Sequence, residues 1–490
     1  MVCRVLAILS SLALSSTAVF AADQPARPNF VIVLADDLGY GDLACYGHPT
    51  IQTPNIDQFA SEGLRLTSCY AAHPNCSPSR TGLMTGRNPF RVGVHDWIPY
   101  ESPIHMRKRE ITIATLLRQA GYDTAHVGKW HMNGLFNRPG QPQPPDHGFN
   151  YWFSTQNNAL PNHHNPENFV RNAKRVGRLE GYAGPLVAKE AIHWLNDIRD
   201  EEKPFFLYVC FHEPHEPIAT DPKYAKLYPS DDPSFSAHHG NITQMDAAFG
   251  EVMDALNDLK LRDNTFVLFT SDNGPAITGV HPHGSAGPLR DKKSYLYEGG
   301  IRVPGIIRWP GHVQPGTTSD TPVSGVDLLP TLCAITDVPV PDDRAIDGTN
   351  ILPVLKGKSI ERETPLYWQF NRARGEPKVA MRIGDWKILA TLKGLPEKKT
   401  VDIKPGEMKA LKSAELDTFE LYNLREDIGE TNDLAQEKPE KLKEMVAKLR
   451  PLYLEIREET PTWPVWIRAE HEVTPIPIEW PDYSKRGKKK

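Results

Sequence analysis

The chain has 490 residues, which is enough for a large hydrophobic core and, by length alone, for about three domains. Hydrophobic residues make up 39% and charged residues 24%, as in ordinary globular proteins. The formal net charge of −5 provides no global positive field, so nucleic acid and acidic surfaces are not expected partners.

The first 22 residues have the pattern of a secretory signal peptide. Arg4 precedes an apolar stretch from Val5 to Leu14, and small residues follow up to Ala21 and Ala22. The apolar stretch is too short to span a bilayer, and we expect cleavage near Ala21 or Ala22. No later segment is apolar for ~20 residues. We therefore predict export to the periplasm or the extracellular space, or a lysosomal or secretory route in a eukaryote, without stable membrane insertion.

Export places the cysteines in an oxidising compartment. Those that follow the signal peptide are Cys45, Cys69, Cys76, Cys210 and Cys333. An odd number leaves one thiol unpaired. If Cys76 were withdrawn from thiol chemistry, an even number would remain, and their pairing is left open by the sequence.

Buried strands alternate with helices over the next part of the chain. Apolar, β-branched and aromatic runs predict strands at residues 29–37, 123–128, 203–211 and 264–274. Capping and amphipathic patterns predict helices at residues 53–63, 112–123 and 242–260. This alternation predicts an α/β fold in which a large, mostly parallel sheet is covered by helices on both faces.

After about residue 360 the pattern changes to short antiparallel strands and one amphipathic helix, "KPEKLKEMVAKLRPLYLEIREE". We expect a smaller α+β subdomain there. The predicted organisation is a signal peptide at residues 1–22, a catalytic domain at 23–360, and a C-terminal subdomain with a tail at 361–490.

Polar residues stand where the predicted parallel strands end. They are Asp36, Asp37, Lys129, His131, His212, His215, Asp272 and Asn273. Because ligands bind at the carboxyl ends of parallel strands, we expect these side chains to meet.

The chemistry of these residues favours a metal and an anion. Asp36, Asp37, Asp272 and Asn273 offer only oxygen ligands, which suit Ca²⁺, or less well Mg²⁺, rather than zinc. Each motif alone is more typical of a turn, but two such strand ends together favour a metal site.

Three basic side chains, Arg80, Lys129 and Lys293, are positioned near glycines or strand ends. With a metal ion they would form a clamp for phosphate or sulfate. His131 and His215 are candidates for proton transfer, although a lone histidine is more often structural. His215 is preferred to His212 because a proline two residues later stiffens its loop.

The segment "CSPSRTGLMTGR" (76–87) resembles the signature of the type I, formylglycine-dependent sulfatases, which reads Cys-x-Pro-Ser-Arg, two residues, and Leu-x-Thr-Gly-Arg. "GKWH" (128–131) and "GPLRDKKSYLYEGGIRVPGIIRWPG" (287–311) are similar to two further landmarks of that family. The similarity extends in order from about residue 28 to residue 455. Spacing to Glu298-Gly299-Gly300 favours Lys293 over Lys292 as the landmark lysine.

This resemblance implies an alkaline-phosphatase-like fold and a particular nucleophile. A formylglycine-generating enzyme would oxidise Cys76 to Cα-formylglycine (3-oxoalanine), whose hydrate attacks sulfur. The modified residue would join Asp36, Asp37, Asp272 and Asn273 around Ca²⁺. The resemblance also implies that Arg80, Lys129 and Lys293 hold the sulfate, that Lys293 or His215 assists the leaving alcohol, and that His131 takes the final proton.

The expected substrate is an O-sulfated carbohydrate, such as a sulfated galactose, N-acetylgalactosamine or related glycan. Residues 137–166 are expected to form a long loop at the pocket rim. Candidate sugar contacts are His95, Asp96, His163 and His164. Trp463 and Trp466 could stack on sugar rings, although interdomain packing is favoured for them.

Two alternatives remain open from the sequence. A phosphomonoester or phosphonate ester hydrolase of the same superfamily would use a similar clamp. A catalytically inactive relative that only binds sulfated glycans would not need the complete set of Cys76, Arg80, Lys129 and His131.

Overall fold

A computed structural model describes residues 27–279, 281–397 and 400–468. The predicted signal peptide lies outside this range. Within these residues there is no helix that combines the length and the hydrophobicity needed to cross a membrane.

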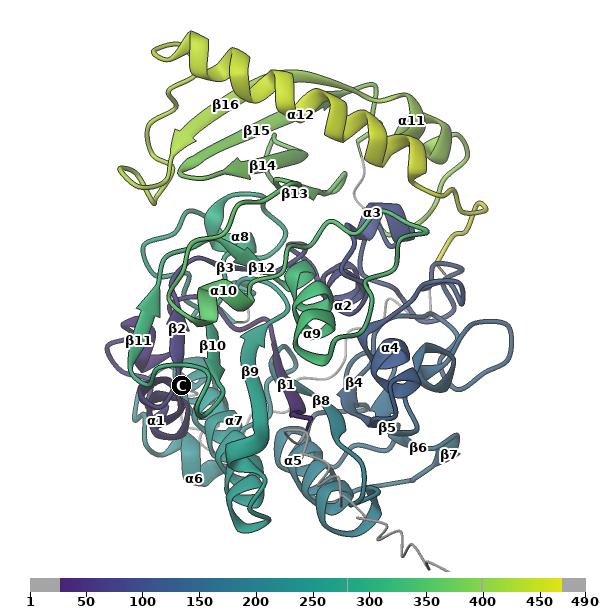
Figure 1. The fold of residues 1–490 in the computed structure, drawn as a ribbon, viewed down its shortest axis with the longest axis vertical. Helices are drawn as coiled ribbons and strands as arrows, with labels where there is room; N and C mark the ends of the chain where they lie inside the picture. The colour runs from purple at the N-terminus through teal and green to yellow at the C-terminus, as the bar shows by residue number, and fades with distance from the viewer. Residues whose placement is uncertain (1–26, 280, 398–399, 469–490) are drawn as a thin grey trace, which may run out of the picture.

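A ten-stranded sheet forms the centre of the larger part of the molecule (Figure 1). Its strand order is β11 (Thr317–Ser319), β2 (Leu64–Leu66), β10 (Gly305–Arg308), β9 (Thr265–Ser271), β1 (Asn29–Asp36), β8 (Phe205–Pro214), β4 (Asp123–Lys129), β5 (Tyr151–Thr155), β6 (Val170–Arg171) and β7 (Lys174–Arg175). The five consecutive strands from β9 to β5 are mutually parallel. The predicted large, mostly parallel sheet is therefore confirmed.

Helices cover both faces of this sheet because successive side chains of each buried strand point to opposite sides. Val31 and Val33 of β1 pack with helices α1 (Pro54–Ser61), α5 (Ala183–His193) and α7 (Pro233–Asp258). Phe30 and Ile32 pack on the other face, with α2 (Cys76–Thr85), α4 (Ile113–Gln119) and α9 (Leu328–Thr336). Shorter helices are α3 (Pro89–Val92), α6 (Pro222–Ala225), α8 (Glu298–Ile301) and α10 (Leu352–Leu355).

Two expectations about element boundaries were wrong. Helix α7 begins at Pro233, well before the predicted start at residue 242, because Asp232 accepts a hydrogen bond from the backbone N–H of Ser234 and caps the helix. The stretch 137–166 is not one long loop, since β5 pairs with β4 inside it.

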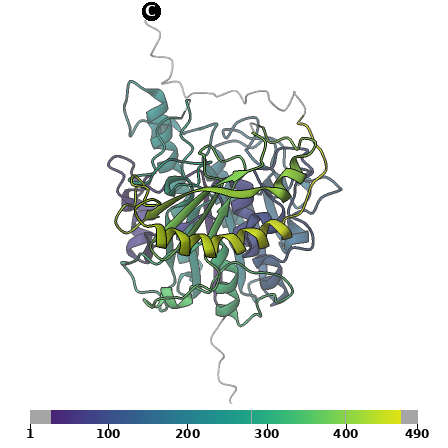
Figure 2. The same ribbon diagram turned by 90° about the horizontal axis from the view of Figure 1, so that it is seen from above.

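The C-terminal part contains a separate antiparallel sheet, as expected. Its strands are β13 (Leu366–Gln369), β14 (Val379–Ile383), β15 (Trp386–Lys393) and β16 (Glu415–Asn423), accompanied by α11 (Glu407–Ser413) and α12 (Pro439–Glu459). Figures 1 and 2 show α12 extended along this sheet. Met381 and Ile388 pack against α12, whereas Ala380 and Leu389 pack on the opposite face against the larger part.

A buried ionic cluster crosses the boundary between the two sheets. Lys387 of β15 lies 2.9 Å from a carboxylate oxygen of Glu298 in α8 and 2.9 Å from one of Glu430. All three side chains are inaccessible to solvent, and Arg302 also pairs with Glu298 at 3.2 Å. Buried ion pairs thus attach the C-terminal sheet to the larger part of the molecule, and these charges compensate one another without help from water.

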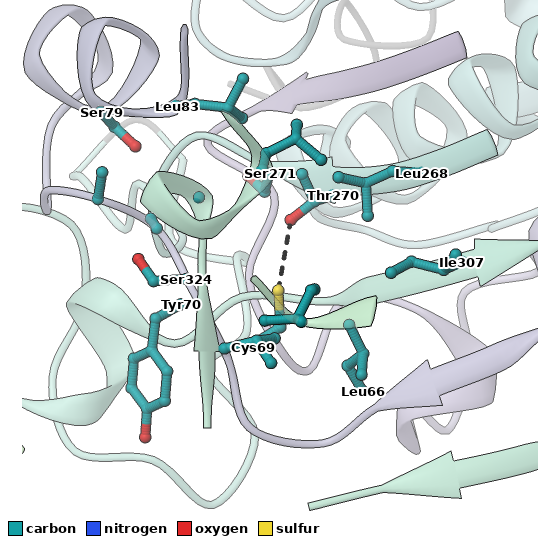
Figure 3. Close-up of a pocket in the computed structure, with 16 residues that line it drawn as sticks. Leu66, Cys69, Tyr70, Ser79, Leu83, Leu268, Thr270, Ser271, Ile307 and Ser324 are labelled. Carbon is teal, nitrogen blue, oxygen red and sulfur yellow. Dashed lines mark hydrogen bonds between the residues drawn. The ribbon is translucent and has the colours of Figure 1, made fainter. Parts of the chain in front are cut away.

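The five described cysteines, Cys45, Cys69, Cys76, Cys210 and Cys333, are all free thiols. The structure therefore contains none of the disulfides that an even number of remaining cysteines would have allowed. Cys69 faces a small, mostly apolar cavity between α2 and the sheet, whose lining includes no second cysteine, and its sulfur lies 3.9 Å from Thr270 Oγ1 (Figure 3).

Replacing Lys387 with methionine should destabilise the protein. The change leaves Glu298 and Glu430 with one buried counterion fewer, and we expect the free energy of unfolding to fall by about 3 kcal/mol. Lys441→Met is the control, because the Lys441–Glu444 pair on α12 is solvent-exposed and its loss should change the free energy of unfolding far less. Urea denaturation measures both values, and equal losses for the two variants would contradict the role of Lys387.

Candidate active site

Five parallel strands end at one edge of the large sheet, and each supplies a side chain to the same place. β1 leads to Asp37, β9 to Asp272 and Asn273, β8 to His215, β4 to His131, and β5 to Asn157. The register pairs Ala35 with Ser271 and Asp36 with Pro214, which aligns the strand ends. The edge is therefore a natural binding crevice.

Helix α2 brings Cys76 to this edge as its first residue. All ten residues of α2 are buried, although half of the segment is polar. Threonine hydroxyls compensate for this by donating to backbone carbonyls one turn earlier, from Thr81 to Ser77 and from Thr85 to Thr81, each at 2.8 Å. A Cβ on Gly82 would lie 2.6 Å from Cβ of Ala72, so only glycine fits there.

The same signature ends the helix and anchors the segment after it. Gly86 ends α2 with a φ of 67°, the left-handed conformation that glycine adopts readily. Arg87 then donates to Glu110 at 2.7 Å and to the carbonyl of Ala345 at 2.9 Å. These signature residues are therefore structural supports for the position of Cys76.

Cys76 lies within a group of potential metal ligands. One ligand atom from each of Asp36, Asp37, Cys76 and His215 falls within 4.8 Å of all the others. The thiol of Cys76 donates to Asp36 Oδ1 at 3.7 Å. Asn273 Nδ2 donates to Asp37 Oδ1 at 2.7 Å, while its buried Oδ1 has no hydrogen-bond partner among the described residues.

This set of donors fits a hard divalent cation. Carboxylate oxygens and an unpaired amide oxygen are the ligands that Ca²⁺ prefers, and a buried oxygen without a partner is costly unless a ligand satisfies it. Asp272 stands beside this group, but its Oδ2 is held by Arg80.

Each buried carboxylate of the site is paired with a cation. Lys129 Nζ lies 2.6 Å from Asp36 Oδ2, and Lys293 Nζ lies 2.6 Å from Asp37 Oδ1. Arg80 donates through Nε at 2.9 Å and Nη2 at 2.7 Å to Asp272 Oδ2, and through Nη1 to the carbonyl of Lys129 at 3.0 Å. Three positive charges therefore balance three negative ones, and among the cations Arg80 and Lys129 are inaccessible to water, whereas Lys293 is partly exposed in the cavity.

The pKa values follow from this arrangement. Burial opposes ionisation of Asp36, but Lys129 and the other nearby cations outweigh it and hold the pKa of that carboxyl well below its usual value. Burial raises the pKa of the Cys76 thiol to about 12, despite the nearby lysines. An unmodified Cys76 is therefore a protonated thiol at neutral pH.

Two histidines differ in how they face the site. His131 Nε2 lies 3.0 Å from the carbonyl of Ile98, which can only accept, so Nε2 carries the proton and Nδ1 keeps a lone pair. That Nδ1 is buried without a hydrogen-bond partner in the described chain. His215 donates through Nδ1 to the carbonyl of Glu216, and its Nε2 lies 3.6 Å from Asp37 Oδ2.

The backbone around the site is conformationally unusual. Asp37, His131 and Ser294 have φ values of 67°, 52° and 74°, which non-glycine residues adopt at a cost of roughly 1–3 kcal/mol each. Gly128 precedes Lys129, and a Cβ there would lie 1.8 Å from the carbonyl oxygen of Cys210. Such strain concentrates at functional sites.

A cavity of about 420 Å³ opens from this edge towards the surface. Its inner end is lined by Asp37, Cys76, His131, His215 and Lys293. Its outer wall adds residues from other elements: Trp97, Asn157, Asn158, Glu216, Lys292, Arg372, Arg374 and Arg468. Arg80 and Lys129 lie behind the inner end, buried against the carboxylates.

The structure separates the candidate pairs that the sequence left open. Lys293 Nζ is 3.4 Å from Cys76 Sγ, whereas Lys292 Nζ donates to the carbonyl of Ile277 at 2.7 Å. His212 is fully buried and lies 2.8 Å from Thr155 Oγ1, away from the cavity. Lys293 and His215 are thus the members of each pair that lie beside Cys76 and Asp37.

The four candidate sugar contacts lie outside the cavity wall. His95 is buried beside the ring of Phe90, and His163 is buried beside His212. His164 stacks on Tyr182 at 4.4 Å between ring centroids. Asp96 is also buried, and its Oδ2 lies 2.7 Å from Arg372 Nε.

Trp463 and Trp466 pack against the core of the larger part. Trp463 also donates through Nε1 to the carbonyl of Gly93. Sequence reasoning did not identify Asn157, Asn158, Arg372 or Arg374 as cavity residues. The arginines lie in the loop between β13 and β14, and no local pattern connects them with residues almost three hundred positions earlier.

A parallel sheet whose edge holds a carboxylate cluster, three cations and a nucleophile position is suited to hydrolysing esters of tetrahedral oxyanions. A family model described as Sulfatase matches residues 28–338. A second, described as N-sulphoglucosamine sulphohydrolase, C-terminal, matches residues 289–414.

Curated relatives and solved structures agree with these matches. The chain is 34% identical over 402 residues to N-acetylgalactosamine-6-sulfatase of Mus musculus, covering 77% of this chain and 74% of that protein. It is 34% identical over 459 residues to Arylsulfatase A of Homo sapiens, covering 86% of each. The crystal structure of Ps i-CgsB in complex with k-i-k-neocarrahexaose aligns with a TM-score of 0.77 and 27% identity, over 91% of this chain and 96% of that chain.

The crystal structure of phosphonate monoester hydrolase of Agrobacterium radiobacter also aligns, with a TM-score of 0.62 and 19% identity, over 89% of this chain and 96% of that one. At this low identity the likeness concerns the fold alone. The chain belongs to the sulfatase family of the alkaline-phosphatase-like superfamily and is a sulfuric ester hydrolase.

Proposed function

We propose that this protein is an exported sulfatase that removes an O-sulfate from a carbohydrate, with Cα-formylglycine at position 76 and Ca²⁺ in the carboxylate cluster. The relatives support a sugar substrate, since one is named for N-acetylgalactosamine and one solved structure contains a neocarrahexaose. The observation that carries the proposal is the position of Cys76, between Asp36 and Lys293 at the inner end of the cavity.

Asp36, Asp37, Asn273 and the modified residue 76 would hold the calcium ion, with Asp272 beside them. The ion would supply positive charge that favours deprotonation of a hydroxyl and stabilises negative charge on sulfate oxygens. Asn273 Oδ1 supports this assignment, because it is a buried acceptor that the described protein groups leave unsatisfied.

Modification of Cys76 would supply two hydroxyls on one carbon, one to attack sulfur and one whose deprotonation releases sulfate. Neither a thiol nor a serine hydroxyl offers that second group. The signature around Cys76 matches the family pattern at each fixed position, from Cys76 to Arg87. Asn75 precedes it and places residue 76 at the start of α2, so its side chain faces the sheet edge.

The remaining side chains would bind the substrate and move protons. Lys293 reaches both Asp37 and Cys76, so it is placed to hold a sulfate oxygen and to protonate the departing alcohol. His215 shares that position on the other side of Asp37. His131 lines the cavity, and its buried, unprotonated Nδ1 has no hydrogen-bond partner among the described residues, which suits it to accept the proton that must leave for sulfate to be released. Lys129 and Arg80 would hold Asp36 and Asp272 in place beneath the sulfate.

Mass spectrometry of protein secreted by its native host should reveal the modified residue directly. The tryptic peptide Leu66–Arg80 contains both Cys69 and Cys76. We expect its mass to be lower than that of the thiol form, with Cys69 alkylated as an internal control. The mature chain should begin just after Ala21 or Ala22. An alkylatable Cys76 in active native protein would contradict the formylglycine assignment, and an uncleaved N-terminus would contradict export.

Calcium should stabilise the folded protein independently of activity. After treatment with a chelator, adding Ca²⁺ at about one hundred times its dissociation constant should raise the free energy of unfolding by ~2.7 kcal/mol, because the ion binds only the folded state. Asp37→Asn should abolish this response, and Asp231→Asn, which changes an exposed carboxylate, should retain it. A thermal unfolding temperature that responds to Zn²⁺ but not to Ca²⁺ would refute the assignment of the ion.

Leaving groups of different basicity should identify the residue that protonates the alcohol. 4-Nitrophenol leaves without a proton, whereas a sugar hydroxyl needs one. The variant that removes the proton donor, Lys293→Met or His215→Asn, should therefore lose about 10²–10⁴-fold in kcat on a sulfated sugar. The same variant should lose less on 4-nitrophenyl sulfate, where the loss that remains for Lys293→Met reflects its missing contact with a sulfate oxygen. Equal losses on both substrates in both variants would exclude these residues as the general acid.

Activity of the wild-type enzyme on 4-nitrophenyl phosphate that exceeds activity on the sulfate would overturn the proposed substrate class.

A further inference from the structure

The outer wall of the active-site cavity carries an excess of positive charge. Its basic side chains are Lys292, Arg372, Arg374 and Arg468, and the acidic side chain among the outer-wall residues described is Glu216. The cavity, at about 420 Å³, is large enough for more than a sulfate group. The outer wall can therefore contact parts of a substrate that take no part in the reaction.

The inner and outer cations differ in what balances them. At the inner end Lys129, Lys293 and Arg80 each contact a carboxylate within 3 Å. At the outer wall Lys292 Nζ donates to a neutral acceptor, the carbonyl of Ile277. Arg374 is exposed, and the described contacts that involve it are made by its backbone, which donates to the carbonyl of Ser294 at 2.9 Å. The charges of Lys292 and Arg374 are thus available to a ligand.

The outer cations are nevertheless held at a defined distance from the nucleophile. Asp96 pairs with Arg372 Nε at 2.7 Å and accepts from Nη2 at 3.1 Å. The same carboxylate accepts from Asn75 Nδ2 at 3.1 Å, and Asn75 is the residue before Cys76. Ser294, which accepts from the backbone of Arg374, donates through Oγ to Asn75 Oδ1 at 3.1 Å. Asn75 therefore connects the β13–β14 loop to the start of α2.

We propose that Lys292, Arg372 and Arg374 form a binding site for a second anionic group, a sulfate or a carboxylate, on the sugar next to the one that loses its sulfate. The preferred substrate is accordingly a polyanionic glycan. This inference rests on the proposed carbohydrate sulfatase activity and extends it. A monosulfated neutral sugar would leave Lys292 and Arg374 without a counterion, whereas a second anion gains charge-assisted hydrogen bonds from guanidinium groups whose geometry matches it. Asp96 is a positioning residue in this arrangement.

The test compares three disaccharides that carry the same reactive sulfate. The neighbouring sugar is neutral in the first, sulfated in the second and a uronic acid in the third, and 4-nitrophenyl sulfate serves as a substrate without a second anion. We expect the wild-type enzyme to prefer at least one charged disaccharide by about tenfold in kcat/KM, mainly through KM. The larger preference identifies the second group as sulfate or carboxylate.

Variants then assign the preference to the site. Arg374→Gln and Lys292→Gln should each remove most of this preference and leave kcat/KM for 4-nitrophenyl sulfate within about twofold. Arg450→Gln, an exposed arginine on α12, is the control for the loss of one positive charge and should retain the preference. Arg372 is less suitable for substitution because buried Asp96 would lose its counterion.

Equal kcat/KM for the three disaccharides would overturn the second anion site and leave the carbohydrate sulfatase activity intact. Hydrolysis of 4-nitrophenyl sulfate without hydrolysis of any disaccharide would overturn both proposals. A preference that persists in Arg374→Gln and Lys292→Gln, or a large loss on 4-nitrophenyl sulfate in either variant, would also refute the assignment.

Discussion

Three buried carboxylates at the carboxyl edge of the sheet are the constraint around which the rest of the site is arranged. Asp36, Asp37 and Asp272 lie close together without solvent, and such a set is stable only when positive charge compensates it. Lys129 comes from the end of β4, Arg80 from α2, and Lys293 from the loop before α8. The site therefore requires the sheet, one helix and one distant loop to be assembled together.

Helix α2 links this charge balance to the position of Cys76, the proposed nucleophile. Cys76 and Arg80 are four residues apart and so lie on the same face of the helix, which allows Arg80 to reach Asp272 while Cys76 faces Asp36. The small and hydroxylated residues between and after them let the helix pack in the interior. The signature is thus both a chemical and a packing requirement, which explains why it is long.

Much of the fold and of the inner site could be predicted from the sequence, because the information there is local. Buried strands are recognisable in the sequence as continuous apolar runs. Because parallel strands end at the same edge of the sheet, the polar residues that follow them lie close together there. The carboxylates, Lys129 and His215 were found in this way. The choice of Lys293 rested on spacing within a family landmark, and the structure places its Nζ beside Cys76.

The outer wall could not be predicted, because its residues are connected only through tertiary contacts. Nothing near Arg372 or Arg374 indicates an active site, and their positions depend on Asp96, Ser294 and the attachment of the C-terminal sheet. Asp96 was considered as a sugar contact, but a buried carboxylate beside an arginine cannot be recognised from sequence alone. The start of α7 was missed for a related reason, since the segment "PSFSAHHGN" (233–241) is buried from Ser236 onward but lacks an amphipathic pattern.

This difference in origin separates chemistry from specificity. The inner end is built on strands of the parallel sheet and on α2, whose geometry is constrained by core packing on both faces. The outer wall is built on loops, including one from the C-terminal sheet that contacts the inner site through Asn75 and Ser294. A substitution in the β13–β14 loop can consequently change the charge of the outer wall without disturbing the balance of charges at the inner end of the cavity.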